Sequence, residues 1–157
     1  MKLLFTLAIM LSAQFTIADS INSKKNKEEM LTRVDSLIEK TKAGQVAVKN
    51  EEMEKVCIAI NELFKLIPDH LIAIGSKMDL FDSKDIEMEN QTKYFLIDMH
   101  KRNNICESTE KAGDNLEIDD TKKQFKTMIK AFAKQKKKIS KSDTDFENDY
   151  NYSYEFH

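Results

Sequence analysis

Hydrophobic residues between positions 50 and 67 recur at steps of three and four, which is the period of an α-helix. On a helix they form a single face, made of Met53, Val56, Cys57, Ile60, Phe64 and Ile67. One of the two cysteines of the chain lies in the middle of this face. We therefore expect a buried helix over residues 50–67, with the other elements packed around it.

Two further stretches flank this helix. The apolar stripe at residues 28–43 predicts a first helix that Gly44 stops, since glycine commonly lies just beyond a helix C-terminus. Pro68 is expected to end or kink the 50–67 helix, because proline donates no backbone hydrogen bond and crowds the preceding turn. The pattern then resumes, which predicts a short additional helix over residues 68–81 with Pro68 in its first turn.

The remaining stripes predict a helix from Ser83 to about residue 103 and a last helix over residues 119–139. Ser83 offers a side-chain oxygen for the N-cap of the former helix. Amphipathic helices joined by short links hide their apolar stripes against one another. We therefore expect an all-α fold, an antiparallel bundle of four main helices with a short fifth segment after Pro68.

The N-terminal stretch has the pattern of a secretory signal peptide. Lys2 supplies a positive charge, residues 3–11 form an apolar run, and residues 16–18 make a cleavage site, with Ala13 as a second cleavage point. The alternative is a membrane anchor, which needs about 20 apolar residues. Because polar residues at positions 12 and 14 interrupt the run, the signal peptide is the favoured interpretation.

Composition and charge are those of one small helical domain. Cleavage after residue 18 would leave 157 less 18, or 139, residues, with a formal net charge that changes from −2 to −3 on loss of Lys2. This balance gives no reason to expect non-specific nucleic-acid binding by the whole molecule, and no specific nucleic-acid partner is expected either. With three glycines and one proline, the chain has few of the turns that an all-β fold needs.

No later segment is apolar enough to cross a membrane, so no transmembrane segment is expected. We therefore predict a secreted, extracellular protein in three parts. These are a signal peptide at residues 1–18, a helical bundle domain at residues 19–139, and a flexible, acidic, tyrosine-rich tail at residues 140–157.

Two cysteines in an exported chain most simply form one disulfide, because the secretory route is oxidising. Cys57 and Cys106 each lie on the apolar side of a predicted helix or at its end. Such a crosslink would stabilise the fold by about 4 kcal/mol in the chain-entropy model. The alternative is two unpaired, buried thiols.

Motifs of catalysis and metal binding are not found in the sequence. A zinc site needs about four ligands, whereas His70, His100 and His157 are scattered without ligand spacing. His70 and His100 are expected at the surface or its boundary. The chain also lacks a nucleophile elbow, a phosphate-binding glycine loop and a calcium loop. We therefore expect a protein that is not an enzyme and needs no metal or cofactor.

The last predicted helix carries a stripe of lysines opposite its apolar face. Lys122, Lys126, Lys130 and Lys134 step by four, and the residues that widen the stripe are Lys123, Lys136, Lys137, Lys138 and Lys141. Of these nine, all except Lys123 and Lys136 are predicted to contact a partner. Such a face suits a polyanion: a sulfated glycosaminoglycan, an anionic membrane or exposed phosphates. The alternative is a solvated face whose cations lie favourably near the helix C-terminus.

Three tyrosines follow among acidic residues in the tail, namely Tyr150, Tyr152 and Tyr154. Tyrosines in such surroundings can be sulfated in secreted chains, and the tail could occupy a basic groove on a partner. It could instead fold back on the lysine stripe or be solvated disorder. Sequons for N-glycosylation begin at Asn90 and Asn151.

In overall design the chain resembles the small secreted helical proteins of insect saliva and venom. The likeness lies in a signal peptide, a helical body rich in lysine and asparagine, one disulfide and a charged tail. It implies a modulator of host haemostasis or immunity, and it carries no site residue over. Insect odorant-binding proteins are also small and helical, but their cysteine pattern is not present.

Two functional hypotheses follow. In the first, the chain is a binding protein that engages an extracellular protein or a sulfated polyanion through the lysine stripe and the tyrosine tail. In the second, it carries a small apolar ligand inside the bundle. The lining residues of that ligand site would be Met53, Phe64, Met78, Phe95, Met99 and Phe132, although such residues at helical spacing usually form plain core.

Overall fold

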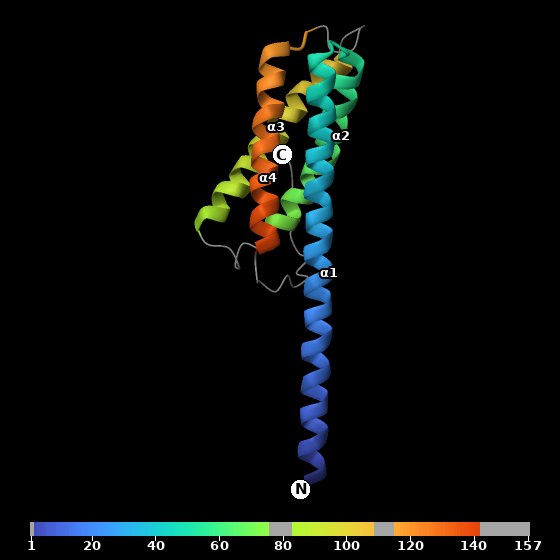
Figure 1. Ribbon diagram of the computed structural model, residues 1–157, viewed down its shortest axis with the longest axis vertical. Coiled ribbons are helices and arrows are strands. Elements are labelled where there is room, and N and C mark those ends of the chain that lie inside the picture. Colours follow the sequence, from blue (N-terminus) through green and yellow to red (C-terminus); the bar gives the residue numbers. More distant parts are fainter. Residues whose placement is uncertain (1, 76–82, 109–114, 142–157) are drawn as a thin grey trace.

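The computed structural model describes residues 2–75, 83–108 and 115–141. The helices in these ranges are α1 (Lys2–Lys49), α2 (Met53–Gly75), α3 (Ser83–Ser108) and α4 (Ile118–Lys141), and the described residues contain no strand (Figure 1). The prediction of an all-α fold is confirmed.

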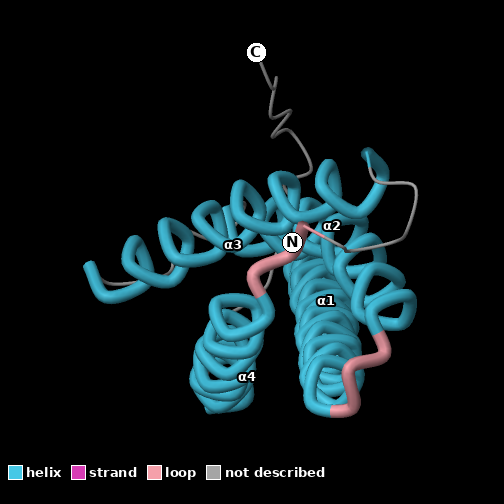
Figure 2. The backbone as a smooth tube through the Cα atoms, turned by 90° about the horizontal axis from the view of Figure 1, so that it is seen from above, coloured by secondary structure: helices cyan, strands magenta, loops and turns pink. Residues whose placement is uncertain are grey.

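Figure 1 shows α1 rising, α2 returning, α3 rising obliquely and α4 descending beside α1. The closest packing joins α1 to α4, α1 to α2, and α2 to α3. Viewed from above in Figure 2, α1 and α4 are seen nearly end-on while α3 lies across them. The helices thus pack in the order α4, α1, α2, α3, and α1 and α2 each contact two neighbours.

The N-terminal part of α1 projects beyond the other helices (Figure 1). Among the α1 residues from position 26 onward, the first that is buried in the core is Met30. Within the described ranges, no helix combines the length and the apolar character that a membrane crossing requires. Cleavage of residues 1–18 stays a prediction.

The predicted end of the first helix at Gly44 is wrong, because α1 continues to Lys49. Gly44 is a buried point of contact between three helices. A Cβ atom at this position would lie 2.7 Å from the ring of Phe125 on α4 and 3.1 Å from the Cβ atom of Ala59 on α2. Glycine therefore permits close helix packing here and does not terminate the helix.

The actual end of α1 is a Schellman motif. The backbone N–H of Glu52 donates to the carbonyl oxygen of Ala47 at 3.0 Å, and that of Glu51 donates to Val48 at 3.2 Å. Glu51 takes the left-handed backbone conformation, with φ of 59°. Glycine usually occupies this position, which explains why the helix end was missed in the sequence.

The predicted end of the helix at Pro68 is also wrong, whereas the alternative, a kink at Pro68, stays a prediction. Helix α2 runs through Pro68 to Gly75, so the described residues contain no separate fifth helix. Proline removes one backbone hydrogen bond, but Ile67, Leu71 and Ile74 on either side of it are at most 2% exposed. Their burial holds the helix across the proline. The rest of the predicted segment, residues 76–81, lies outside the described residues.

The core forms where the apolar faces of all four helices meet. The residues expected on the inner face of residues 50–67 are mainly buried, but Met53 and Phe64 are half-buried and pack at the edge of the cluster. The rings of Phe95 on α3 and Phe132 on α4 meet edge to face, with centroids 5.6 Å apart. These two helices therefore touch through large side chains.

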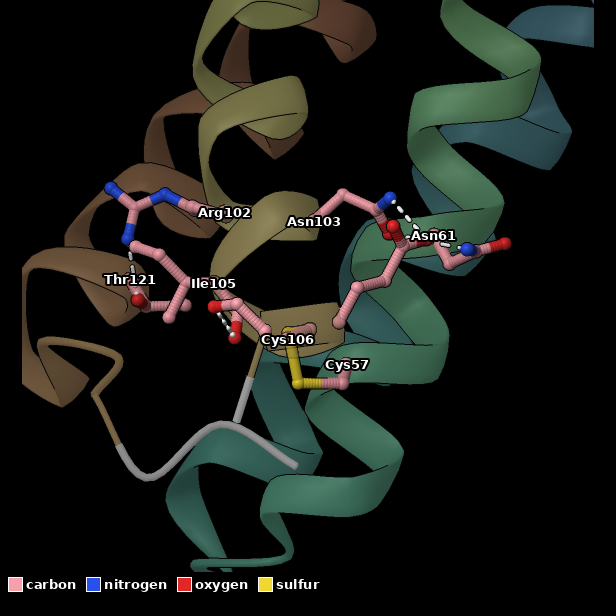
Figure 3. Close-up of a disulfide and its surroundings, with 9 residues drawn as sticks. Cys57, Asn61, Arg102, Asn103, Ile105, Cys106 and Thr121 are labelled. Carbon is pink, nitrogen blue, oxygen red and sulfur yellow. Dashed lines mark hydrogen bonds between the residues drawn. A yellow bond between two sulfur atoms is a disulfide. The ribbon is translucent and has the colours of Figure 1, made fainter. Parts of the chain in front are cut away.

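The predicted disulfide between Cys57 and Cys106 is confirmed, with Cα atoms 5.6 Å apart. It fastens the first turns of α2 to the last turns of α3 (Figure 3). Beside it, Asn61 on α2 donates to Asn103 on α3 at 3.1 Å, and Asn103 donates to Glu107. The crosslink thus closes the open end of the α2–α3 pair.

Candidate functional site

The outer side of α4 presents one continuous row of lysines. Its opposite side is buried through residues that include Phe125, Met128, Phe132 and Ile139. Because the two sets differ by about half a turn in helical position, burial of the first exposes the second. We call the exposed set the lysine face; it consists of Lys122, Lys123, Lys126, Lys130, Lys134, Lys137 and Lys141.

These seven ammonium groups form no ion pair with any described residue. The sequence from Lys122 to Lys141 contains no aspartate or glutamate. Like charges one turn apart repel each other mildly, and the face extends about 28 Å along the helix axis. A long anion that contacts several turns would relieve this repulsion.

Two other lysines of the predicted stripe do not share this exposure. Lys136 is half-buried and its Nζ donates to Asp35 on α1 at 2.6 Å. Lys138 is half-buried at the edge that faces α3. There it lines a cavity of about 110 Å³ together with Glu87, Gln91 and Lys134. Helical spacing alone assigned Lys136 and Lys138 to the exposed stripe, because spacing within α4 does not show which helices pack against its two edges.

Arg102 on α3 holds the first turn of α4. Its guanidinium donates to Asp98 on α3 at 2.8 Å, and it also donates to Asp120 and to Thr121, the latter shown in Figure 3. Burial lowers the pKa of Arg102, but hydrogen bonds and charges from the two aspartates outweigh burial and raise it. No pattern in the sequence marks Arg102 as a link between helices, since Asp120 and Thr121 lie on another helix and only Asp98 lies on its own.

A buried polar chain links three helices behind the lysine face. His70 on α2 contacts Oε1 of Gln135 on α4 at 2.8 Å, and Nε2 of Gln135 donates to Thr92 on α3 at 3.1 Å. Thr92 in turn donates to the carbonyl oxygen of Met88. Because this orientation of Gln135 presents its oxygen to the ring, His70 Nε2–H is the donor.

The expectation that His70 lies at the surface or its boundary is wrong, because this side chain is 0% exposed. Burial lowers the pKa of His70 from 6.5 to about 4; the hydrogen bond to Gln135 opposes this change, and the charge of Arg33 adds to it. A second proton would go to Nδ1, which has no partner in the described part of the chain. His100, in contrast, is exposed.

The other predicted site residues fall in different places. Asn90 is exposed on α3, whereas Thr92, the third residue of its sequon, is buried in the polar chain. The tail residues Asn151, Tyr150, Tyr152 and Tyr154 lie outside the described residues. A contact between the tyrosine tail and the lysine face therefore stays a prediction.

Of the residues suggested for an apolar ligand site, those that the structure describes belong to the packed core or its edge. Phe95, Met99 and Phe132 are at most 1% exposed within one hydrophobic cluster. Met78 lies outside the described residues. In the described ranges, histidine, cysteine and acidic side chains form no group of three or more that could hold a metal ion.

Comparisons with protein-family models, with curated proteins and with solved structures find no match to this chain.

Proposed function

We propose that this chain is a secreted, non-enzymatic binding protein whose lysine face engages an extracellular polyanion, with a sulfated polysaccharide as the best-fitting class. The observation that carries the proposal is the set of seven exposed lysines without described ion-pair partners on a single helix face. The disulfide between Cys57 and Cys106 supports an oxidising, extracellular location.

A polymer suits this face better than a single small anion does. Four of its lysines, Lys122, Lys126, Lys130 and Lys134, follow one another at one per turn, or about 6 Å apart along the axis. Because they follow one another along the exposed side of one helix, each ammonium would contact a different anionic group of an extended ligand. Because the side chains are exposed, binding would be electrostatic and strongly weakened by salt.

In this proposal the bundle is a scaffold that keeps the lysine face straight. The core holds the inner side of α4, and Arg102 fixes its first turn. Preorganised charges bind a polyanion without the entropy cost of ordering a flexible segment. If the chain modulates host haemostasis or immunity, as its general design suggests, this face is where it would compete for sulfated ligands.

The test is retention on immobilised heparin, a sulfated polysaccharide. A triple variant, Lys126→Gln, Lys130→Gln and Lys134→Gln, removes the middle of the face, and glutamine keeps helix propensity. The matched control substitutes Lys49, Lys65 and Lys101, which are exposed on the other three helices, by glutamine. We expect the first variant to elute at clearly lower salt than the control. Equal losses would show that only net charge matters and would contradict the proposal.

A further inference from the structure

An open groove of about 410 Å³ lies between α1 and α4. Its apolar lining consists of Ile38 from α1 and of Ile129 and Ala133 from α4. The polar lining consists of Asp35, Lys42, Lys136, Lys137 and Ser140. The groove therefore adjoins the C-terminal part of the lysine face, with which it shares Lys137.

The charges around this groove are not balanced. Lys136 is neutralised by Asp35, since its Nζ lies 2.6 Å from Oδ1 and 2.8 Å from Oδ2 of that residue. Lys42 and Lys137 are exposed and form no ion pair with a described residue. An occupant that matches the groove would thus combine one apolar group with negative charges on both sides of it.

The chain itself supplies such a sequence directly after α4. Residues 142–157 contain five acidic residues and no lysine or arginine, and their first aromatic residue is Phe146, between Asp145 and Glu147. Phe146 follows Lys141 by five residues, which can span about 17 Å. Ala133 lies eight residues back along α4, or about 12 Å. The connection is therefore long enough to reverse and reach the groove.

We propose that Asp145, Phe146 and Glu147 dock in the groove between α1 and α4 of the same molecule. The ring of Phe146 covers the apolar lining, and the two carboxylates face Lys42 and Lys137. The inference rests on the shape, charge and position of the groove and does not depend on the proposed function. Because Lys137 belongs to both the groove and the lysine face, docking would neutralise one charge at the C-terminal end of that face.

The absence of tryptophan from the chain provides a direct test. Phe146→Trp places a single fluorescent indole at the docking position of the full-length protein. We expect its emission to be blue-shifted relative to the same protein in denaturant, and protected from a soluble quencher. Adding Ala133→Glu, an exposed substitution that puts a negative charge in the groove, should abolish the shift and the protection.

The matched control is Thr127→Glu in the same Phe146→Trp protein, because Thr127 is exposed on α4 and does not line the groove. This variant should keep the blue shift. Solvent-exposed emission of the parent, or the same change in both glutamate variants, would overturn the proposal. A blue shift that is lost on dilution would also overturn it, by showing that the tail docks on a second copy. Heparin retention is measured separately, so either proposal can fail alone.

Discussion

His70 shows how far the surroundings of one side chain can depart from its local sequence. It follows Asp69, a polar neighbour that favours a surface position, yet its ring is completely buried against Gln135 and Phe132. Gln135 and Phe132 lie 65 and 62 positions away from His70 in the sequence, so no local sequence pattern could predict these contacts. The burial of Gln135 could not be predicted either, because a glutamine between lysines is typical of a solvent-exposed helix face.

The buried imidazole predicts a loss of stability in acid. Its pKa is about 4 in the fold and 6.5 in the unfolded chain, so the unfolded chain binds more protons between these values. The contribution of His70 to the free energy of unfolding is therefore constant above pH 6.5 and decreases as the pH falls below that value. At pH 5 the decrease is about 2 kcal/mol. Urea unfolding at pH 7.5 and 5 measures this.

The comparison for that experiment is His70→Gln, which cannot gain a proton in this range. This variant should be less stable than the parent at pH 7.5, because it loses packing around the ring. The difference in the free energy of unfolding between the two proteins should be smaller at pH 5, because only the parent is destabilised by protonation of the imidazole in the unfolded chain. A difference that stays constant between the two pH values would contradict the lowered pKa.

Glu51 predicts a stabilising substitution. Its φ of 59° is unfavourable for a residue with a side chain, and glycine adopts this conformation without strain. Glu51→Gly should therefore raise the free energy of unfolding by about 1 kcal/mol. In Glu54→Gly, in the first turn of α2, the same change should lower the free energy of unfolding, because it loses helix propensity and a favourable charge at the helix N-terminus. A loss of stability in Glu51→Gly would count against the Schellman motif.

At the scale of the element, the positions of helices were predictable but two of their limits were not. The period of apolar residues located the cores of all four helices, because each helix buries one continuous face. Gly44 and Pro68 are local helix breakers that tertiary packing overrides. The sequence could not show that Gly44 meets Phe125, or that Ile67 and Ile74 are both buried beside Pro68.

Substitution of Gly44 by alanine should destabilise the protein, although helix propensity alone would predict a gain in stability. Alanine favours a helix interior by about 1 kcal/mol over glycine, but its Cβ atom would collide with the buried ring of Phe125. Gly44→Ala should thus lower the free energy of unfolding by about 2 kcal/mol. Chemical denaturation measures this change, and an increase in stability would show that α1 and α4 are less closely packed than described.

At the scale of the whole molecule, charge is unevenly distributed although the formal net charge is only −2. The lysine face could be predicted from the sequence because one helix contains all of it and its inner side is plainly apolar. The exact members of the lysine face could not be predicted. Lys136 and Lys138 are half-buried at the edges of α4 that face α1 and α3, and Lys136 is paired with Asp35. The groove between α1 and α4 was equally beyond prediction, because its residues lie about 100 positions apart.

The most direct test of the central claim is the salt dependence of the dissociation constant for a heparin oligosaccharide of defined length. The logarithm of affinity should fall linearly with the logarithm of salt concentration, as it does for other polyanions. The slope for the triple variant at Lys126, Lys130 and Lys134 should be smaller than that of the parent by about 2 to 3. A slope unchanged from the parent, or matched by the control triple variant, would contradict the assignment of the lysine face.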